Sequence, residues 1–520
     1  MQLATLDIVI IVVYAIGLFA LAQWVSRNRT GQSKDSTEYF LASKNLPWWA
    51  IGASLIAANI SAEQIVGMSG SGYAIGLAIA SYEWMAAITL VIVGKWFLPI
   101  FLENKIYTMP QFLEQRYGTR IRTLMAVFWL ALYIFVNLTS IVWLGSIAVT
   151  KVAGIDQSTA LVALGLFALL YQLWGGLRAV AMTDIVQVTL LVLGGLLVSG
   201  LTLNEIGGGG GIVAGFRTLV ERAPDHFHMI LTEASPYYKD LPGLSVLIGG
   251  MWIANLSYWG FNQYIIQRAL AARSLPEAQK GVIFAAYLKL LMPLIIVLPG
   301  IAAVMLAPDL TRPDEAYPSM MRLLPSGIAG LVFAALIAAI VASMASKINS
   351  IATIFTLDIY NKIGAPKSET RLVAVGRITA IVAILLAILT ARPLLGSFDQ
   401  AFQYIQEYTG FFTPGIVVIF LLGLFWKRAT EAGALAATVG SFALSVALKA
   451  WWPELPFMDR MAVVFVLALG LAVVCSLLWP VGQSSNRIQM ANVSFGTSAS
   501  FNFAASGVAL VLIALYSVWW

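Results

Sequence analysis

Long apolar stretches recur along the whole chain and are separated by short polar connections. A membrane-spanning helix needs roughly 20 predominantly apolar residues, and a window of that length predicts fourteen spans. The predicted spans lie near residues 7-26, 47-70, 76-102, 123-150, 157-173, 179-203, 243-266, 281-307, 326-357, 371-391, 399-426, 430-451, 460-480 and 501-520. The pattern therefore predicts an all-α polytopic membrane protein with about 14 transmembrane helices.

The composition excludes several other classes of protein. Of the 520 residues, 60% are hydrophobic and 11% are charged, whereas soluble globular chains average roughly 25% charged residues. The single cysteine, Cys475, cannot form a disulfide within the chain. These figures exclude a soluble enzyme, a disordered chain and a disulfide-rich secreted module. The first apolar stretch lacks a basic leader and a cleavage site, so we interpret it as a retained helix.

The basic residues predict the orientation of the chain in the membrane. Most of them fall in the connections that follow odd-numbered spans, which the positive-inside rule places in the cytoplasm. With an even number of spans, both termini are then predicted outside the cytoplasm, as is the longest connection, Asn204 to Pro242. Its two histidines, His226 and His228, indicate a solvated loop rather than a metal site. The net charge of +6 reflects the cytoplasmic loops and does not predict binding to nucleic acid.

The sequence carries no sign of ATP-driven or enzymatic chemistry. The run Gly207–Gly211 is not followed by the Gly-Lys-Ser/Thr of a phosphate-binding loop. The predicted spans contain no histidine, so haem or quinone chemistry is not indicated. No nucleophile, base and oxyanion group converge in the pattern, so we do not expect an enzyme. Transport driven by an ion gradient, or passive passage, remains.

Polar residues interrupt the second and the seventh predicted span with a shared motif. Residues 58-61 read Ala-Asn-Ile-Ser, and residues 254-257 read Ala-Asn-Leu-Ser. The two spans are five apart and so cross the membrane in opposite directions. This is typical of an inverted repeat whose leading helices are broken at the substrate site. The alternative is that these small polar residues pack helices and recur by chance.

The helix after each interrupted span carries a charge, Glu83 in one and Lys289 in the other. A charge at mid-bilayer costs roughly 2.5 to 3.5 kcal/mol, so such groups are paired, hydrated or functional. Together with Gln64 and Asn255 they predict a pocket rich in donors and acceptors, which suits a neutral polyhydroxylated ligand. Alternatively, the two charges form a structural ion pair, or Lys289 extends toward the membrane interface.

A third polar cluster lies in the eleventh span, at Phe402–Gly410. Its aromatic rings could stack on a sugar ring while Gln406 binds a hydroxyl. A polar seam between packed helices is the alternative interpretation.

These segments, together with Leu46–Trp49, resemble the sodium/solute symporter family, and most closely its bacterial sodium/galactose branch. The resemblance extends over nearly the whole chain. It implies a leucine-transporter-like core of two inverted five-helix repeats with broken first helices. The implied divisions are a leading helix and cytoplasmic loop at 1-45, the first repeat at 46-203, an outer loop at 204-242, the second repeat at 243-428, and three peripheral helices at 429-520.

The resemblance also implies which residues contact the substrate. The implied sugar contacts are Gln64, Glu83, Asn255, Lys289 and Gln406. The implied gates are Tyr258 on the inner side of the sugar and Met68, Tyr82 and Phe402 on the outer side. Ala86 stands where the galactose branch has a serine that contacts the sugar, which leaves the preferred sugar open.

The implied sodium site lies where the second span meets the ninth. Its ligands would be the carbonyl groups of Ala57, Ile60 and Ala339 and the hydroxyl group of Ser343. Oxygen ligands suit a hard cation, although a helical serine more often bonds its own backbone. Ala342 replaces a serine ligand of the family, which leaves the strength of coupling open. Asp184 matches a residue on the sodium exit path; the alternative is an N-cap near Thr183.

We therefore expect a symporter in the cell (inner) membrane that couples sodium entry to uptake of a neutral hexose, such as galactose or glucose, by alternating access. One cation that enters down about 100 mV releases roughly 2.3 kcal/mol, which corresponds to about a 50-fold sugar gradient. The alternatives are a relative that carries myo-inositol, proline or pantothenate, and a sugar-binding uniporter or sensor with weak ion coupling. The expected partners are the sugar, sodium and the lipid bilayer. The oligomeric state, the stoichiometry and the use of protons or lithium stay open.

Overall fold

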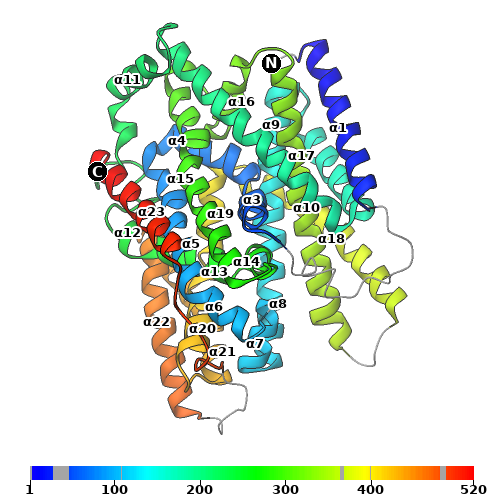
Figure 1. Ribbon diagram of the computed structural model, residues 1–520, viewed down its shortest axis with the longest axis vertical. Helices are drawn as coiled ribbons and strands as arrows, with labels where there is room; N and C mark the ends of the chain where they lie inside the picture. Colours follow the sequence, from blue (N-terminus) through cyan, green and yellow to red (C-terminus); the bar gives the residue numbers. More distant parts are fainter. Residues whose placement is uncertain (1–2, 27–45, 107, 364–367, 399, 481–487) are drawn as a thin grey trace.

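The computed structural model describes residues 3-26, 46-106, 108-363, 368-398, 400-480 and 488-520; the side chains at 18-19, 21-26, 173-185 and 369 are outside this description. The described residues form a helical bundle (Figure 1). Their one β-type contact is an isolated bridge between Leu46 and Ala272. The all-α prediction is confirmed.

The helices fall into three sets along the chain. Those before the long connection are α1 (Thr5–Ser26), α3 (Trp48–Asn59), η2 (Glu63–Met68), α4 (Ser69–Ile75), η3 (Leu77–Ala80), α5 (Ser81–Ile92), η4 (Val93–Phe97), α6 (Leu98–Glu103), α7 (Met109–Tyr117), α8 (Thr119–Ala131), η5 (Leu132–Leu138), α9 (Thr139–Ala153) and α10 (Gln157–Ile206). Those from the connection to the second bent helix pair are α11 (Ile212–Arg222), η6 (Pro224–Phe227), α12 (Ser245–Ile248), α13 (Gly250–Phe261), α14 (Gln263–Leu270), α15 (Leu275–Leu306), η7 (Pro313–Glu315), α16 (Ala316–Met320), η8 (Met321–Leu323), α17 (Ile328–Thr353), η9 (Ile354–Ile359), η10 (Tyr360–Lys362), α18 (Glu369–Leu395), α19 (Ala401–Thr409) and α20 (Thr413–Phe425). The last three are α21 (Glu431–Trp451), α22 (Phe457–Leu478) and α23 (Ala499–Val518).

The number of membrane-length helices differs from the predicted fourteen. Within the described residues, 9 helices are long and apolar enough to cross a membrane, or up to 11 if each bent pair is one span. Two of the predicted spans, near 157-173 and 179-203, lie in one helical run, α10; its part Val186–Ile206 is long and apolar enough to cross alone, and its part Gln157–Gln172 is a shorter apolar helix. The predicted span near 243-266 is divided among α12, α13 and α14, each of which is too short to pass alone.

The chain bends by 67° between α3 and the helical run Glu63–Ile75. Ile60 leaves the helical region, with φ −70° and ψ 113°, and the helix resumes as the π-helix η2. The Ser61 side chain accepts a hydrogen bond from the Glu63 backbone N–H at 3.2 Å. A short polar side chain thus caps the second segment, as serine does at helix starts generally. Single π-helical turns are frequent at functional sites.

The seventh predicted span is interrupted at a different place from its shared motif. Helix α13 continues through Ala254–Ser257, and the chain leaves helical geometry at Asn262. Asn255 donates its side-chain amide to the Met251 carbonyl at 3.1 Å, which is compatible with a continuous helix. Asn262 instead accepts a hydrogen bond from the Tyr264 backbone N–H and so begins α14. The position of this break was not predictable from the motif because asparagine can either cap a helix or bond back along it.

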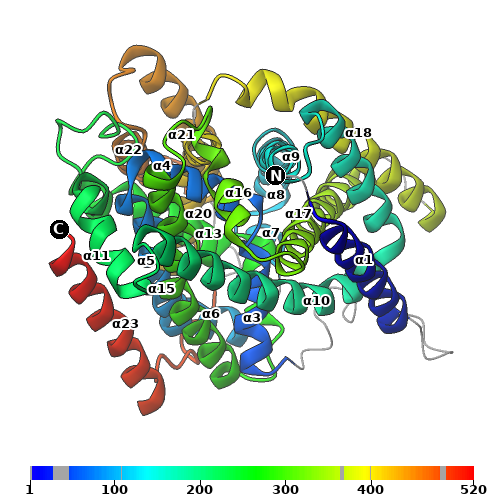
Figure 2. The same cartoon turned by 90° about the horizontal axis from the view of Figure 1, so that it is seen from above.

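Helices α5, α13 and α15 lie inside the bundle, whereas α1, α18, α22 and α23 lie at its periphery (Figure 2). The peripheral helices expose large apolar side chains; in α23, Leu510 is 65% exposed. Such a surface is unfavourable in water and favourable against lipid. This arrangement agrees with a multi-pass membrane protein.

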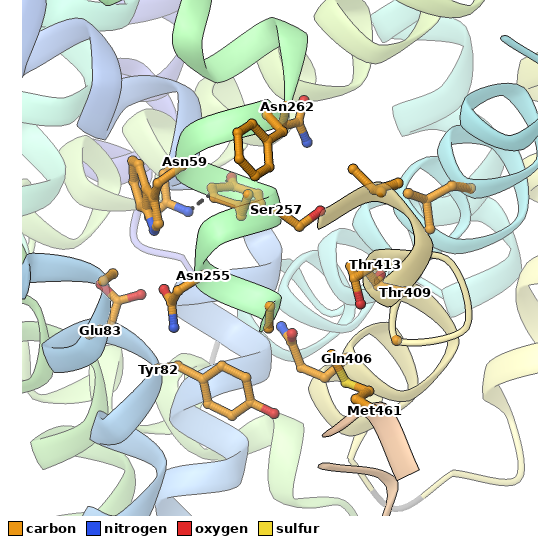
Figure 3. A pocket seen from close by; sticks show the side chains of 18 of the residues that line it. Asn59, Tyr82, Glu83, Asn255, Ser257, Asn262, Gln406, Thr409, Thr413 and Met461 are labelled. Atoms are coloured by element: carbon orange, nitrogen blue, oxygen red, sulfur yellow. Dashed lines mark hydrogen bonds between the residues drawn. The ribbon is translucent and has the colours of Figure 1, made fainter. Parts of the chain in front are cut away.

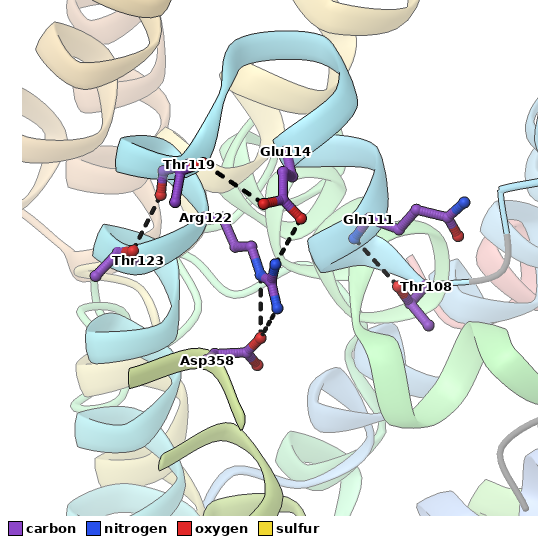
Figure 4. Close-up of polar contacts among 7 residues, drawn as sticks. All are labelled: Thr108, Gln111, Glu114, Thr119, Arg122, Thr123 and Asp358. Atoms are coloured by element: carbon purple, nitrogen blue, oxygen red, sulfur yellow. Dashed lines mark hydrogen bonds and ion pairs between the residues drawn. The ribbon is translucent and has the colours of Figure 1, made fainter. Parts of the chain in front are cut away.

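Polar contacts fasten the ends of the helices together. At one end, Arg122 of α8 forms an ion pair with Glu114 of α7 at 2.5 Å and a second with Asp358 of η9 (Figure 4). Near the N-terminus, the Asp7 carboxylate accepts the backbone N–H groups of Gly327 and Gly330 at 2.7 and 2.9 Å. An anion at a helix start is stabilising, so this contact fastens α1 to α17.

Candidate substrate and cation sites

All nine residues predicted to contact or enclose the substrate line one cavity. They are Gln64, Met68, Tyr82, Glu83, Asn255, Tyr258, Lys289, Phe402 and Gln406. They come from η2, α5, α13, α15 and α19, which are far apart in the sequence. We call this cavity the central cavity. Figure 3 shows Tyr82, Gln406 and Met461 toward one end of it and Asn262 at the other, with Asn255 and Ser257 between.

A buried ion pair forms one wall of the central cavity. The Lys289 ammonium lies 2.5 Å from the Glu83 carboxylate, and the two side chains are 1% and 4% exposed. Lys289 also donates to the Asn59 side-chain carbonyl and lies 5.1 Å from the centre of the Trp259 ring. The alternative of a structural ion pair therefore agrees with the geometry. Both groups nevertheless line the cavity, so they also face any molecule bound there.

Hydrogen bonds continue from this ion pair along one end of the cavity. Asn59 donates its amide to the Tyr258 hydroxyl at 3.0 Å. The hydroxyl groups of Tyr258 and Tyr264 are 2.6 Å apart. The chain of contacts from Glu83 through Lys289, Asn59 and Tyr258 thus ends at Tyr264.

Aromatic packing closes the opposite end. The rings of Tyr82 and Phe402 meet edge to face with centroids 5.1 Å apart, and both side chains are buried, as is Met68. A Cβ atom added at Gly67 would lie 3.4 Å from the Phe402 Cβ atom, so η2 and α19 approach closely here. The predicted outer gate residues are thus brought together.

Several residues of the central cavity were not predicted. They include Asn59, Trp129, Ser257, Trp259, Asn262, Thr409, Thr413 and Met461. Asn59, Ser257 and Thr409 fall inside the polar segments at 58-61, 254-257 and 402-410, so the sequence contains a signal for them. Trp129 and Met461 lie in ordinary apolar helices, where nothing in the sequence distinguishes them from packing residues.

A second cavity gathers most of the residues predicted to bind sodium. Ala57, Ala339 and Ser343 line it, as do Ala342 and Gln187. We call it the cation cavity. Since the last carbonyl groups of a helix lack intrahelical partners, the end of α3 at Asn59 makes the Ala57 carbonyl a suitable ligand.

Two of the predicted sodium residues are not part of this lining. Ile60 is buried in the apolar core but is not among the residues that line the cavity. Asp184 lies outside the residues whose side chains are described, although α10 reaches the cavity one turn later, at Gln187 and Val188.

The cation cavity also contains positive side chains that the prediction did not include. Lys347 of α17 and Arg268 of α14 both line it. Arg268 donates to the Ser54 hydroxyl at 2.9 Å. Lys347 donates to the Asn137 side-chain carbonyl at 3.4 Å and lies 3.8 Å from the centre of the Tyr264 ring. Tyr264 itself lines the cavity, so the hydrogen-bond chain from Glu83 connects the two cavities.

A charged cluster lies beside Gln406. The Glu407 carboxylate is paired with Lys449 at 2.7 Å and with Arg460 at 2.9 Å. Asp240, in the connection before α12, interacts with the same carboxylate. Burial and the negative charge of Glu407 raise the pKa of Asp240 to about 6.

The chain matches a family model and related proteins over most of its length. Residues 39–440 match the sodium:solute symporter family. The chain is 50% identical to the sodium/glucose cotransporter of Vibrio parahaemolyticus, with 100% of this chain and 99% of the relative covered. It is 34% identical to the sodium/myo-inositol cotransporter 2 of Bos taurus, with 83% and 68% covered. It is 33% identical to the sodium/glucose cotransporter 1 of Ovis aries, with 85% and 71% covered.

Solved transporter structures share the fold. A Na+-coupled sialic acid symporter in a substrate-bound outward-open state superposes with a TM-score of 0.77 at 23% identity, covering 92% of this chain and 99% of the other. Mhp1, a nucleobase-cation-symport-1 family transporter in a closed conformation, gives a TM-score of 0.55 at 10% identity, with 87% and 98% covered. The chain thus belongs to the sodium:solute symporter family, as its sequence motifs predicted, and is a sodium-coupled secondary transporter rather than an enzyme.

Proposed function

We propose that the protein carries a neutral hexose such as glucose or galactose into the cell together with sodium. The observation that carries this proposal is the set of groups on the central cavity. A carboxylate, an ammonium group and three amides line it, from Glu83, Lys289, Gln64, Asn255 and Gln406. Each sugar hydroxyl both donates and accepts a hydrogen bond, and this set satisfies both functions. The sodium/glucose relative at 50% identity supports the same substrate class.

The two ends of the cavity suggest the gates of alternating access. Tyr82, Phe402 and Met68 would separate the sugar from the outside, and Tyr258 would separate it from the cytoplasm. Tyr258 is hydrogen-bonded to Asn59, at the end of α3. A rearrangement of the break after α3 would therefore move the inner gate. In related folds, alternating access is largely a rocking or gating of one repeat against the other around a site built on broken helices.

We assign sodium to the cation cavity, with the carbonyl groups of Ala57 and Ala339 and the hydroxyl group of Ser343 as ligands. Ile60 and Asp184 are retained as a further carbonyl ligand and as a residue on the exit path. Sodium held there would fasten α3 to α17. It would thereby stabilise the end of α3 that presents Asn59 to Lys289 and Tyr258.

We also propose fourteen membrane crossings. Three crossings would add to the 11 candidate spans, namely α1, the first part of α10 and the run α12–α14. The core would consist of the repeats 46-203 and 243-428, with the divisions 1-45, 204-242 and 429-520 around it. Contacts support both termini on the outer side of the inner membrane. The Met229 backbone N–H in the 204-242 loop donates to the Trp519 carbonyl at 2.7 Å, and Asp7 caps the start of α17.

Purified protein in proteoliposomes tests the proposal. Labelled glucose or galactose should accumulate inside when sodium is placed outside, and an equal potassium gradient should give only equilibration. Equal uptake under both gradients would overturn sodium coupling and leave a uniporter. A competition series with myo-inositol, proline and pantothenate identifies the solute. The myo-inositol relative favours a cyclic polyol as the second candidate, and stronger competition by myo-inositol than by either hexose would replace the hexose assignment.

A further inference from the structure

Lys347 is a buried charge next to the proposed sodium ligands that is not itself one of them. Lys347 is 6% exposed and lines the cation cavity. It follows Ser343 by four residues on α17, so the two side chains lie on the same face of the helix, one turn apart. A cation that reaches Ser343 is therefore close to the Lys347 ammonium.

Neutral groups contact the Lys347 ammonium directly, and Arg268, which lines the same cavity, repels it. The Lys347 nitrogen lies 3.8 Å from the centre of the Tyr264 ring and 5.0 Å from that of Tyr133. It also donates to the Asn137 side-chain carbonyl at 3.4 Å. Aromatic faces attract a desolvated cation. These contacts hold the ammonium in the cavity and supply no opposite charge of their own.

The nearby carboxylate is Glu63, which attracts Lys347 electrostatically. Among the described residues, the two do not approach as closely as a direct ion pair. The Ser140 hydroxyl donates to the Glu63 carboxylate at 2.9 Å, and Ser140 follows Asn137 by three residues along η5 and α9. The ammonium and the carboxylate are thus bridged by neighbouring side chains of one helical run. Glu63 is the first residue of η2, so this bridge joins the break after α3 to α17.

We propose that Lys347 is a resident cation of the cation cavity. It weakens sodium binding by repulsion and so favours release, and it holds the break after α3 against α17 when sodium is absent. The inference rests on the proposed sodium site. A transported ion must bind well enough to enter and weakly enough to leave, and a charge one turn away shifts that balance. The repulsion of two monovalent cations at about one helical turn is large enough to change sodium affinity about tenfold.

Neutralising the lysine tests the proposal. In Lys347→Met the unbranched apolar side chain can stay against the Tyr264 ring. The sodium concentration that gives half-maximal glucose uptake should fall about tenfold, and glucose binding measured without sodium should weaken several-fold. Lys347→Arg keeps the charge, and both quantities should stay within about twofold of the wild type. Lys151→Met is the matched control, because Lys151 pairs with Glu315 at 2.6 Å, away from both cavities; it should leave the sodium requirement unchanged.

A second measurement separates this inference from the proposed function. Sodium should raise the melting temperature of the detergent-purified protein, and Lys347→Met should reach half of that effect at about one tenth of the sodium concentration. Sodium-coupled uptake with an unchanged or higher sodium requirement in Lys347→Met would overturn the inference alone. Loss of both sodium-dependent uptake and sodium-dependent stabilisation in the wild type would overturn the proposed function. If Lys347→Met does not fold, Lys347→Gln provides the same neutralisation, and the same outcomes apply.

Discussion

Two buried lysines face the two cavities, and their charges are balanced in different ways. Lys289 in the central cavity contacts the Glu83 carboxylate directly at 2.5 Å. Lys347 in the cation cavity contacts an amide and aromatic rings, and Glu63 lies beyond bridging side chains. The first lysine forms a neutral unit with its partner, which suits a neutral ligand. The second has its carboxylate at a greater distance and lies beside the proposed sodium site.

Burial alone therefore does not define the role of a charge in a membrane protein. A directly paired lysine contributes hydrogen-bonding groups without a net field. A lysine balanced only at a distance contributes a field that changes with whatever else enters the cavity. The hydrogen-bond chain from Glu83 through Asn59 and Tyr258 to Tyr264 connects the two environments. A change in the field at one end can thus be transmitted to the other.

The largest effect is expected from breaking the direct pair. Glu83→Gln or Lys289→Met leaves one buried charge without its partner, which typically destabilises a protein by about 3 to 5 kcal/mol. The double variant removes both charges and should be more stable than either single variant. The free energy of unfolding in mixed detergent micelles, measured for the full double-mutant cycle, checks this. Additive effects of the two single changes would show that the pair is not a unit.

A smaller effect is expected from the amides that face the ligand. Gln64→Ala and Gln406→Ala each remove hydrogen bonds worth about 0.5 to 1.5 kcal/mol, so glucose should bind roughly 2- to 12-fold more weakly. Tryptophan fluorescence can follow the binding, because Trp129 and Trp259 line the same cavity. Gln115→Ala, an exposed glutamine on α7, is the control and should bind glucose normally. Unchanged affinity in both cavity variants would remove them from the substrate site.

One substitution in the cation cavity should strengthen sodium binding instead of weakening it. Ala342 lines the cavity without a side-chain oxygen, and Ala342→Ser would add a hydroxyl near Ser343. One added ligand of about 1 kcal/mol should lower the half-saturating sodium concentration about fivefold. Ala338→Ser, on the same helix but outside the lining, is the control. If both serine variants shift the sodium requirement equally, the added hydroxyl is not acting as a ligand.

Much of the substrate site could be predicted from the sequence because polar residues inside apolar helices are scarce. Glu83, Lys289 and Gln406 were visible against apolar neighbours, and the structure brings them to one cavity. Their sugar-binding role remains a prediction. Trp129 and Met461 were not predictable because an apolar side chain that lines a cavity has the same pattern as one that packs a core.

The helix boundaries were predicted less well, for two physical reasons. Hydropathy measures only whether a stretch is apolar, so it does not indicate that the predicted spans near 157-173 and 179-203 are joined in one helical run, α10. Asparagine can cap a helix or bond to its own backbone, so the motif at 254-257 did not indicate that α13 would end at Phe261. The role of Lys347 was likewise hidden, because only the fold places it beside the cation cavity.

The smallest effect is expected at the charged cluster beside Gln406. There, in contrast to the two lysines, a carboxyl group lies near a second group of the same charge. Burial and the negative charge of Glu407 raise the pKa of Asp240 from 3.8 to about 6. A raised carboxyl pKa favours the folded state at low pH, and this stability is lost as the pH rises from about 4 through 6. Because the site is partly open to solvent, Asp240→Asn should stabilise the protein by only about 1 kcal/mol at pH 7.5, and much less at pH 4. Melting temperatures at the two pH values check this, with the exposed Asp225→Asn of the same connection as the control. An equal gain at both pH values would mean that the asparagine acts through packing. The negative charge of Glu407 would then not raise the pKa of Asp240, and the two carboxyl groups would not repel each other.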